Sequence, residues 1–159
     1  MTRRFLRPPG AQPERAFQAR CIRCGKCAAA CAYRSIRLGG WADGPAQMGA
    51  PLVQPRSVPC YLCMKCPPAC PTGALDPKLT DRRKVRMGLA RLDRTRCLAF
   101  QGTLCRSCYT ICPLPDEAIA MDAELRPGVD GDRCVGCGLC ENACPVEPAA
   151  IAVLPREGP

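Results

Sequence analysis

Histidine is absent from this chain, and aromatic residues are scarce. Without histidine the chain cannot form the mixed Cys/His zinc sites of many small metal-binding domains, nor use imidazole as a general base. Aromatic residues make up only 4% of the sequence, so an ordinary aliphatic–aromatic core would be thin. No stretch approaches roughly eighteen consecutive apolar residues, so the sequence predicts no transmembrane helix.

Cysteine, proline and glycine are abundant instead, with 16, 18 and 14 residues in a chain of 159. The prolines and glycines leave little room for long helices. So much cysteine is typical of a small protein that is held together by staples rather than by a large apolar core. We therefore expect a small, loop-rich α+β fold in which bound metal clusters form much of the core, and an apo chain that is largely unfolded.

The most informative stretch is Cys134-Val-Gly-Cys137-Gly-Leu-Cys140-Glu-Asn-Ala-Cys144-Pro145. This is the C-x2-C-x2-C-x3-C-P run by which bacterial ferredoxins hold iron–sulfur clusters. A loop with a cysteine at every third residue can wrap three thiolates around one [4Fe–4S] cube, while in two-cluster ferredoxins the fourth cysteine ligates the neighbouring cluster. Gly136 and Gly138 lie between the ligands, where a positive φ and close approach of the backbone to the cluster are easiest.

Four versions of this motif occur along the chain, two of them irregular. Motif one has Ala32 where proline is usual, and motif three has seven residues between Cys97 and Cys105. The longer loop can still return a thiolate to the same cluster, at a larger cost in loop-closure entropy. Within motif three, Cys105, Cys108 and Cys112 have the strongest claim, and Cys97 is the expected remaining ligand. The candidate iron ligands, for four [4Fe–4S] clusters, are Cys21, Cys24, Cys27, Cys31, Cys60, Cys63, Cys66, Cys70, Cys97, Cys105, Cys108, Cys112, Cys134, Cys137, Cys140 and Cys144.

Short apolar segments accompany the motifs and complete an internal repeat. Strands are expected at 36–38, 72–75, 87–92, 118–121 and 149–154. The repeat predicts tandem bacterial ferredoxin-like [4Fe–4S] modules, each with short helices and a short two-stranded sheet.

The repeat also suggests how the chain is organised. In order, we expect an extended basic arm over 1–20, a first motif pair over 21–75 with a surface insert at 39–58, a linker and lead-in over 76–96, a second motif pair over 97–154, and a tail over 155–159. The sequence leaves open a nested pairing instead, of motif one with motif four and motif two with motif three.

Two other uses of cysteine fit the spacing poorly. A structural zinc site uses pairs of C-x2-C joined by longer loops, whereas here a third cysteine follows at once in three of the motifs. An even number of cysteines also allows a disulfide framework, but thiols three residues apart, repeated four times, are an unusual way to build one. Each motif has four cysteines, so no open iron site and no catalytic residue are predicted.

The formal charge of +9 first suggests a nucleic-acid partner. Each [4Fe–4S] cluster with four thiolates contributes about −2, so four clusters bring the holo-protein to about +1. Aromatic side chains that could stack on bases are scarce in the basic stretches. We therefore expect no nucleic-acid partner, and interpret the basic residues as compensation for cluster charge and as a docking surface.

Nearly the full length of the chain resembles the NapG/MauM group of ferredoxin-type proteins. The most specific parts of the likeness are the Leu6-Arg-Pro-Pro-Gly10 lead and the irregular motif three with Cys105-x2-Cys108-Tyr109 and Ile111-Cys112-Pro-Leu114. Further matches are Pro13-Glu14, Ala16-Phe17, Cys21-Ile-Arg-Cys24-Gly, Val58-Pro-Cys60, Cys70-Pro-Thr-Gly-Ala-Leu-Asp76, Cys134-x2-Cys137-Gly-x-Cys140 and Ala149-Ala-Ile151 with Val153-Leu-Pro155.

The resemblance implies an electron-transfer subunit with four [4Fe–4S] clusters. Its implied partners are a membrane-bound ferredoxin-type quinol dehydrogenase subunit and a redox enzyme or cytochrome acceptor, such as periplasmic nitrate reductase. The alternative is a maturation or accessory ferredoxin for methylamine dehydrogenase. The implied location is the periplasm, at the membrane. Because Arg3-Arg4-Phe5-Leu6 is followed by prolines rather than by the apolar segment of a twin-arginine export signal, the cytoplasm is the alternative location.

Overall fold

The computed structural model describes residues 5–156 and consists of short elements joined by long loops. Its helices are α1 (Glu14–Arg20), α2 (Lys26–Ala29), α3 (Ser107–Thr110) and α4 (Leu139–Asn142), with 3-10 turns η1 (Trp41–Asp43), η2 (Pro45–Gln47), η3 (Arg82–Lys84) and η4 (Leu98–Gln101). Its strands are β1 (Ile36–Leu38), β2 (Pro51–Val53), β3 (Leu89–Leu92), β4 (Ile119–Met121), β5 (Pro127–Val129) and β6 (Ile151–Leu154). The expected class, loop-rich with short helices and short sheets, is confirmed.

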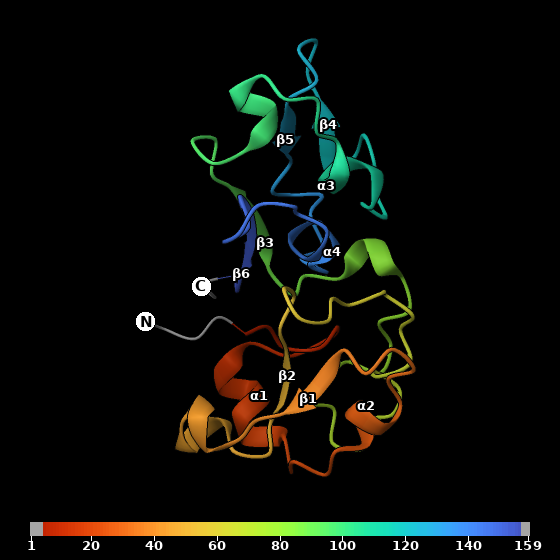
Figure 1. The fold of residues 1–159 in the computed structure, drawn as a ribbon. Helices are drawn as coiled ribbons and strands as arrows, with labels where there is room; N and C mark the ends of the chain where they lie inside the picture. The colour runs from red at the N-terminus through yellow and green to blue at the C-terminus, as the bar shows by residue number, and fades with distance from the viewer. Residues whose placement is uncertain (1–4, 157–159) are drawn as a thin grey trace.

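The strands form three antiparallel two-stranded sheets, in which β1 pairs with β2, β3 with β6, and β4 with β5. Figure 1 shows α1, α2 and the β1–β2 sheet at one end of an elongated molecule, and the β4–β5 hairpin at the other. Four of the predicted strands are confirmed as β1, β3, β4 and β6. The segment 72–75 is not a strand, because only Leu75 makes a bridge, to Ala11.

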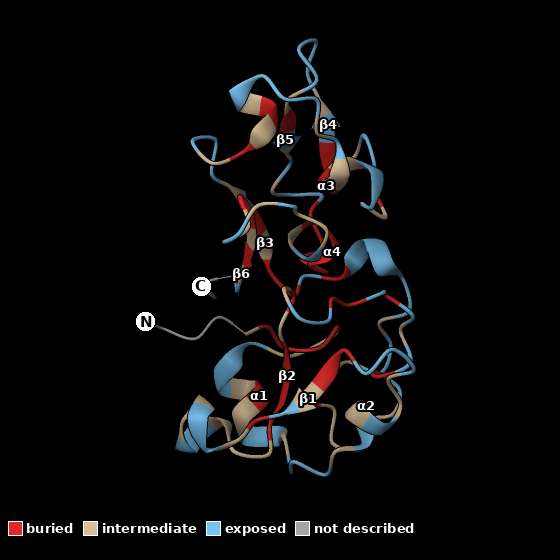
Figure 2. Ribbon diagram, in the orientation of Figure 1, coloured by how far each residue is buried: buried red, intermediate tan, exposed pale blue. Residues whose placement is uncertain are grey.

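One apolar core runs through both ends of the molecule. It includes Leu6, Phe17 and Val53 from the N-terminal part, and Val135 and Ile151 from the C-terminal part. Figure 2 shows buried ribbon along β2 and around α4 and β6, while the outer loops are exposed. This core extends across both motif pairs, and a smaller separate cluster is formed by Cys97, Ala99 and Ala150.

The N-terminal segment differs from the expected extended arm. The backbones of Leu6 and Val53 exchange two hydrogen bonds of 2.8 Å, and Phe17 on α1 is fully buried. The guanidinium of Arg7 lies 4.4 Å from the centre of the Phe17 ring and donates hydrogen bonds to the Glu14 carboxylate. This segment therefore closes the core of the first motif pair. Arg3 and Arg4, which belong to the expected arm, and residues 157–159 of the expected tail lie outside the described residues.

Within residues 5–156, no helix is both long and apolar enough to cross a bilayer. The longest helix, α1, has 7 residues.

Candidate iron–sulfur sites

The three closely spaced cysteines of motif four surround a cavity of about 340 Å³. Cys112, the last cysteine of motif three, lines the same cavity, and the remaining wall is apolar, with Leu114, Ile119 and Val153. The cavity thus brings four sulfur atoms from two motifs into an otherwise water-poor interior. This arrangement differs from the expectation that Cys112 groups with Cys105 and Cys108.

A second cavity, of about 330 Å³, lies beside the first. Its thiols are Cys97, Cys105 and Cys108 of motif three and Cys144, the last cysteine of motif four. The long loop after Cys97 is accommodated by the 3-10 turn η4, which returns the chain toward Cys105. The irregular motif therefore still presents three thiols to one cavity, and the two motifs exchange their last cysteines.

The first motif pair repeats this exchange. A third cavity, of about 330 Å³, is lined by Cys21, Cys24 and Cys27 of motif one together with Cys70, the last cysteine of motif two. The other four thiols, Cys31, Cys60, Cys63 and Cys66, also lie near one another. Burial raises the pKa of Cys60 to about 11, and the Cys31 and Cys63 thiols add to that shift. The last cysteine of motif two thus lies with the first three thiols of motif one, just as the last cysteine of motif four lies with thiols of motif three.

Short helices and glycines set the path of the motif loops. The helices α2, α3 and α4 are single turns, each containing one cysteine of the run: Cys27, Cys108 and Cys140. Gly136 and Gly138 have φ of +72° and +84°, the left-handed region that favours glycine. A Cβ at Gly138 would lie 2.3 Å from the Cβ of Pro55, and one at Gly136 would lie 2.3 Å from the backbone nitrogen of Gly88. Glycine is therefore needed here for close packing between segments as well as for the turn.

Burial keeps the central thiols protonated unless a metal replaces the proton. It raises the pKa of Cys66 and of Cys137 to about 12, and neighbouring thiols add to both shifts. The last cysteines of motifs two and four instead accept backbone hydrogen bonds, from Leu75 N–H to Cys70 Sγ at 3.4 Å and from Ala150 N–H to Cys144 Sγ at 3.3 Å. Such N–H···S bonds stabilise sulfur charge and tune the reduction potential of a cluster.

The donor atoms of the pockets fit a [4Fe–4S] cluster. Three of the pockets are each lined by four cysteines, and four thiolates are the donor set of such a cluster. A tetrahedral zinc site would instead need all four sulfurs at about 2.3 Å from one centre.

The two motif pairs touch through their cysteine loops. Cys60 N–H donates a hydrogen bond of 2.8 Å to the carbonyl of Cys137, and Met87 N–H donates one of 3.1 Å to the carbonyl of Val135. The Cys60 thiol adds to the raised pKa of Cys137, after burial, which is the larger cause. A first-pair set and a second-pair set of thiols therefore lie against each other at the centre of the molecule.

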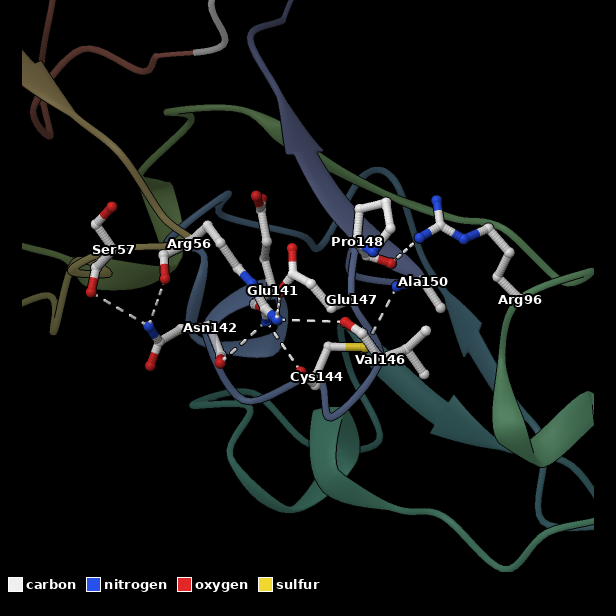
Figure 3. A network of polar contacts seen from close by, with 10 residues as sticks. All are labelled: Arg56, Ser57, Arg96, Glu141, Asn142, Cys144, Val146, Glu147, Pro148 and Ala150. Atoms are coloured by element: carbon white, nitrogen blue, oxygen red, sulfur yellow. Dashed lines mark hydrogen bonds and ion pairs between the residues drawn. The ribbon is translucent and has the colours of Figure 1, made fainter.

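Arg56, in the expected surface insert, fastens this contact (Figure 3). Its guanidinium donates hydrogen bonds to the carbonyl of Glu141, in the last turn of α4, at 2.7 Å and to that of Cys144, just beyond α4, at 2.9 Å, and it pairs with the Glu147 carboxylate. Asn142 Nδ2 returns a hydrogen bond of 3.0 Å to the carbonyl of Arg56. Nothing in the sequence around Arg56 indicated this role, because its acceptors are main-chain groups almost 90 positions away.

Comparisons with known proteins agree with this geometry. Models of the 4Fe-4S dicluster domain match residues 20–74 and 90–153. A methylamine utilization ferredoxin-type protein MauM from Methylobacillus flagellatus is 46% identical over 96% of this chain and 69% of its own length. A ferredoxin-type protein NapG from Escherichia coli is 44% identical over 94% of this chain and 70% of its own length, and a MauM from Paracoccus denitrificans is 42% identical over 97% and 73%. The chain thus carries [4Fe–4S] clusters, and two dicluster domains account for four of them.

Proposed function

Because the chain belongs to the NapG/MauM family of ferredoxin-type proteins, we propose that it passes electrons between a membrane-bound quinol-oxidising ferredoxin-type partner and a redox enzyme such as periplasmic nitrate reductase. Its general role is iron–sulfur electron transfer. The observation that carries the proposal is the grouping of all sixteen cysteines into four sets of four.

In this proposal each cluster has three ligands from one motif and one from its neighbour, as in two-cluster ferredoxins. The ligand sets are Cys21, Cys24, Cys27 and Cys70; Cys60, Cys63, Cys66 and Cys31; Cys134, Cys137, Cys140 and Cys112; and Cys97, Cys105, Cys108 and Cys144. The two dicluster units correspond to the motif pairs 21–75 and 97–154, joined by the linker 76–96. A [4Fe–4S] cluster supplies one-electron chemistry, and the chain supplies its ligands, burial and nearby charge.

The sets follow one another in a line. Cys27 of the first set adds to the raised pKa of Cys66 in the second, and Cys60 of the second set acts in the same way on Cys137 in the third. Cys108 of the fourth set likewise adds to the raised pKa of Cys140 in the third. This sequence of neighbours supports a linear path for electrons, in which the hydrogen bond from Cys60 to Cys137 joins the two motif pairs.

The partners and the location rest on the family. Electron transfer in this family implies redox partners at both ends of the path, and we propose a membrane-bound ferredoxin-type subunit at one of them. The periplasmic side of the membrane is the proposed location, with the cytoplasm as the alternative.

Iron counting tests the ligand sets directly. Holo-protein prepared without oxygen should contain about sixteen iron and sixteen sulfide per chain. Cys112→Ala and Cys137→Ala should each lower iron to about twelve, and the double variant should also retain about twelve, because both residues serve one cluster. In the double variant Cys112→Ala/Cys105→Ala the iron content should fall to about eight per chain, because the two residues serve different clusters. The control variant Leu104→Ala, at an exposed position next to Cys105, should keep all its iron. Additive loss in the Cys112/Cys137 double variant would contradict the sets, and zinc without sulfide would contradict the clusters.

A second candidate function is accessory work in the maturation of methylamine dehydrogenase. The observation that favours it is the 42–46% identity to four proteins named for methylamine utilization. Deleting the gene in its host separates the two. Loss of nitrate reduction with intact methylamine oxidation supports the first function, and the reverse result supports the second.

A further inference from the structure

The two motif pairs carry opposite charge. Residues 21–75 contain six lysines and arginines but only one acidic residue, Asp43, which gives a formal charge of +5. Residues 97–154 contain three arginines and eight acidic residues, which gives −5. Each range has eight cysteines, so two bound clusters of about −2 each shift both values equally and the difference persists. With two clusters bound to each range, the values become about +1 and −9, so the end of the molecule that holds the first motif pair is far less negative than the opposite end (Figure 1).

Exposed cysteine residues also occur in one motif pair only. Cys24 of motif one and Cys63 of motif two are exposed, whereas the eight cysteines of the second motif pair are buried or half-buried. An electron reaches a partner most readily where a cluster ligand comes to the surface. The first motif pair therefore offers two such points, on neighbouring loops.

Basic residues flank these two cysteines in the sequence, and acidic residues do not. Arg23, Lys26, Arg34 and Lys65 are exposed, and none forms an ion pair with another residue in the described part of the chain. No Asp or Glu occurs at 15–42 or 44–75, and Asp43 is bound to Arg37 by hydrogen bonds of 2.7 and 2.8 Å. No carboxylate therefore pairs with these four basic side chains in the described part of the chain.

Exposed apolar groups lie on the same loops. Tyr33, next to Arg34, stacks on Tyr61, next to the motif-two cysteines, with ring centroids 4.5 Å apart and an angle of 25° between the planes. Both rings are about half exposed, at 50% and 46%, and Ile22 is 65% exposed. The stacked pair brings the chain just after motif one, with Arg34, against the motif-two loop, and so places apolar contact area beside positive charge. Docking surfaces typically combine an apolar centre with a polar rim in this way.

We propose that this basic face, formed by Ile22, Arg23, Cys24, Lys26, Tyr33, Arg34, Tyr61, Cys63 and Lys65, is the docking site for an electron-transfer protein that presents an acidic surface around its own redox centre. Unpaired positive charge favours a negative partner and speeds its approach. The two exposed thiols favour a redox protein over an anionic membrane, because a lipid surface has no use for a cluster ligand at the contact. The proposal rests on the proposed electron-transfer function and adds the chemistry of one partner.

The test uses two c-type cytochromes of opposite net charge as oxidants of the reduced holo-protein. In each encounter one electron leaves a reduced [4Fe–4S] cluster, which is oxidised, and converts a ferric haem to a ferrous haem. Lys26→Glu/Lys65→Glu should slow electron transfer to the acidic cytochrome by about tenfold or more at low salt, and the effect should fade as salt screens the charges. The control Lys78→Glu/Arg133→Glu changes the net charge equally but lies outside the basic face, and should alter this rate by less than about twofold.

Three results would overturn the proposal. The first is an equal decrease of the electron-transfer rate in the two double variants, which would show that the rate depends on net charge and not on the basic face. The second is an unchanged cytochrome rate in Lys26→Glu/Lys65→Glu together with lost binding to phosphatidylglycerol vesicles, which would assign the face to a membrane. The third is a lack of electron transfer to either cytochrome by protein with its full iron content, which would also remove the proposed function. The first two results would overturn only the docking site, whereas the third would also overturn the electron-transfer function on which it rests.

Discussion

Replacing Gly138 by alanine should disturb the joint between the two motif pairs. Gly138 has a φ of +84°, and a Cβ there would lie 2.3 Å from the Cβ and 2.9 Å from the Cγ of Pro55. Pro55 is held in place because the next residue, Arg56, is bound to carbonyls at the end of α4 and just beyond it. The added methyl group must therefore displace backbone, because it does not meet the end of a flexible side chain.

Gly102 provides a matched control for the free-energy cost of placing alanine at a positive φ. Its φ is +82°, but a Cβ there would have no atom within 4 Å. Gly102→Ala should therefore cost only the left-handed conformation, about 1–2 kcal/mol. Gly138→Ala should cost that amount plus about 1–3 kcal/mol for the overpacked contact with Pro55. The difference between the two variants isolates the packing between the motif pairs.

The assay is the rate at which the clusters lose their visible absorbance in a fixed concentration of guanidinium chloride without oxygen. A gap of about 1–3 kcal/mol corresponds to roughly 5- to 150-fold faster bleaching in Gly138→Ala than in Gly102→Ala, provided the contact breaks before the transition state of unfolding. Pro55→Gly removes the clashing atoms, so it should recover part of the loss when it is combined with Gly138→Ala. Equal rates for the two alanine variants would refute the reasoning.

Three further variants or measurements test other parts of the structure. Phe17→Ala should cost about 3–5 kcal/mol, because the ring is fully buried beside the first-set cavity, and heating should then release iron from the first motif pair before the second. Arg56→Ala should cost about 1–3 kcal/mol and speed hydrogen exchange at residues 141–147, and Arg56→Lys should not restore the bidentate contacts. In a redox titration followed by electron paramagnetic resonance, the clusters of the first motif pair should have higher potentials than those of the second, by tens of millivolts at low salt, and the gap should shrink with added salt.

Local pattern predicted the features that local interactions determine. The cysteine spacing and the intervening glycines indicated tight loops, and the apolar segments at 36–38, 87–92, 118–121 and 149–154 contain the strands β1, β3, β4 and β6. Each of these needs only a few neighbouring residues to form. The segment 72–75 failed as a strand because the N-terminal chain passes beside it, so that it pairs only once, through Leu75 and Ala11.

Features that depend on distant contacts were not predictable in the same way. The general rule for two-cluster ferredoxins places the last cysteine of a motif at the neighbouring cluster, as Cys112 is placed here, but which motif is that neighbour depends on how the loops pack. The N-terminal segment appeared as an extended basic arm because charge and proline dominate its composition. Its apolar residues are few, but Leu6 and Phe17 are almost completely buried, since the thin core of the first motif pair needs them.

The buried ligands of motif four and the exposed basic face at motifs one and two together suggest a direction of electron flow. Reduction adds negative charge to a cluster, which is disfavoured where the ligands are buried, as Cys137 and Cys140 are, and where the formal charge of the motif pair is −5. The same added charge is favoured beside the unpaired basic groups around the exposed Cys24 and Cys63. Electrons should therefore move downhill from the second motif pair, across the contact of Cys60 with Cys137, toward the face at which an acidic partner would dock.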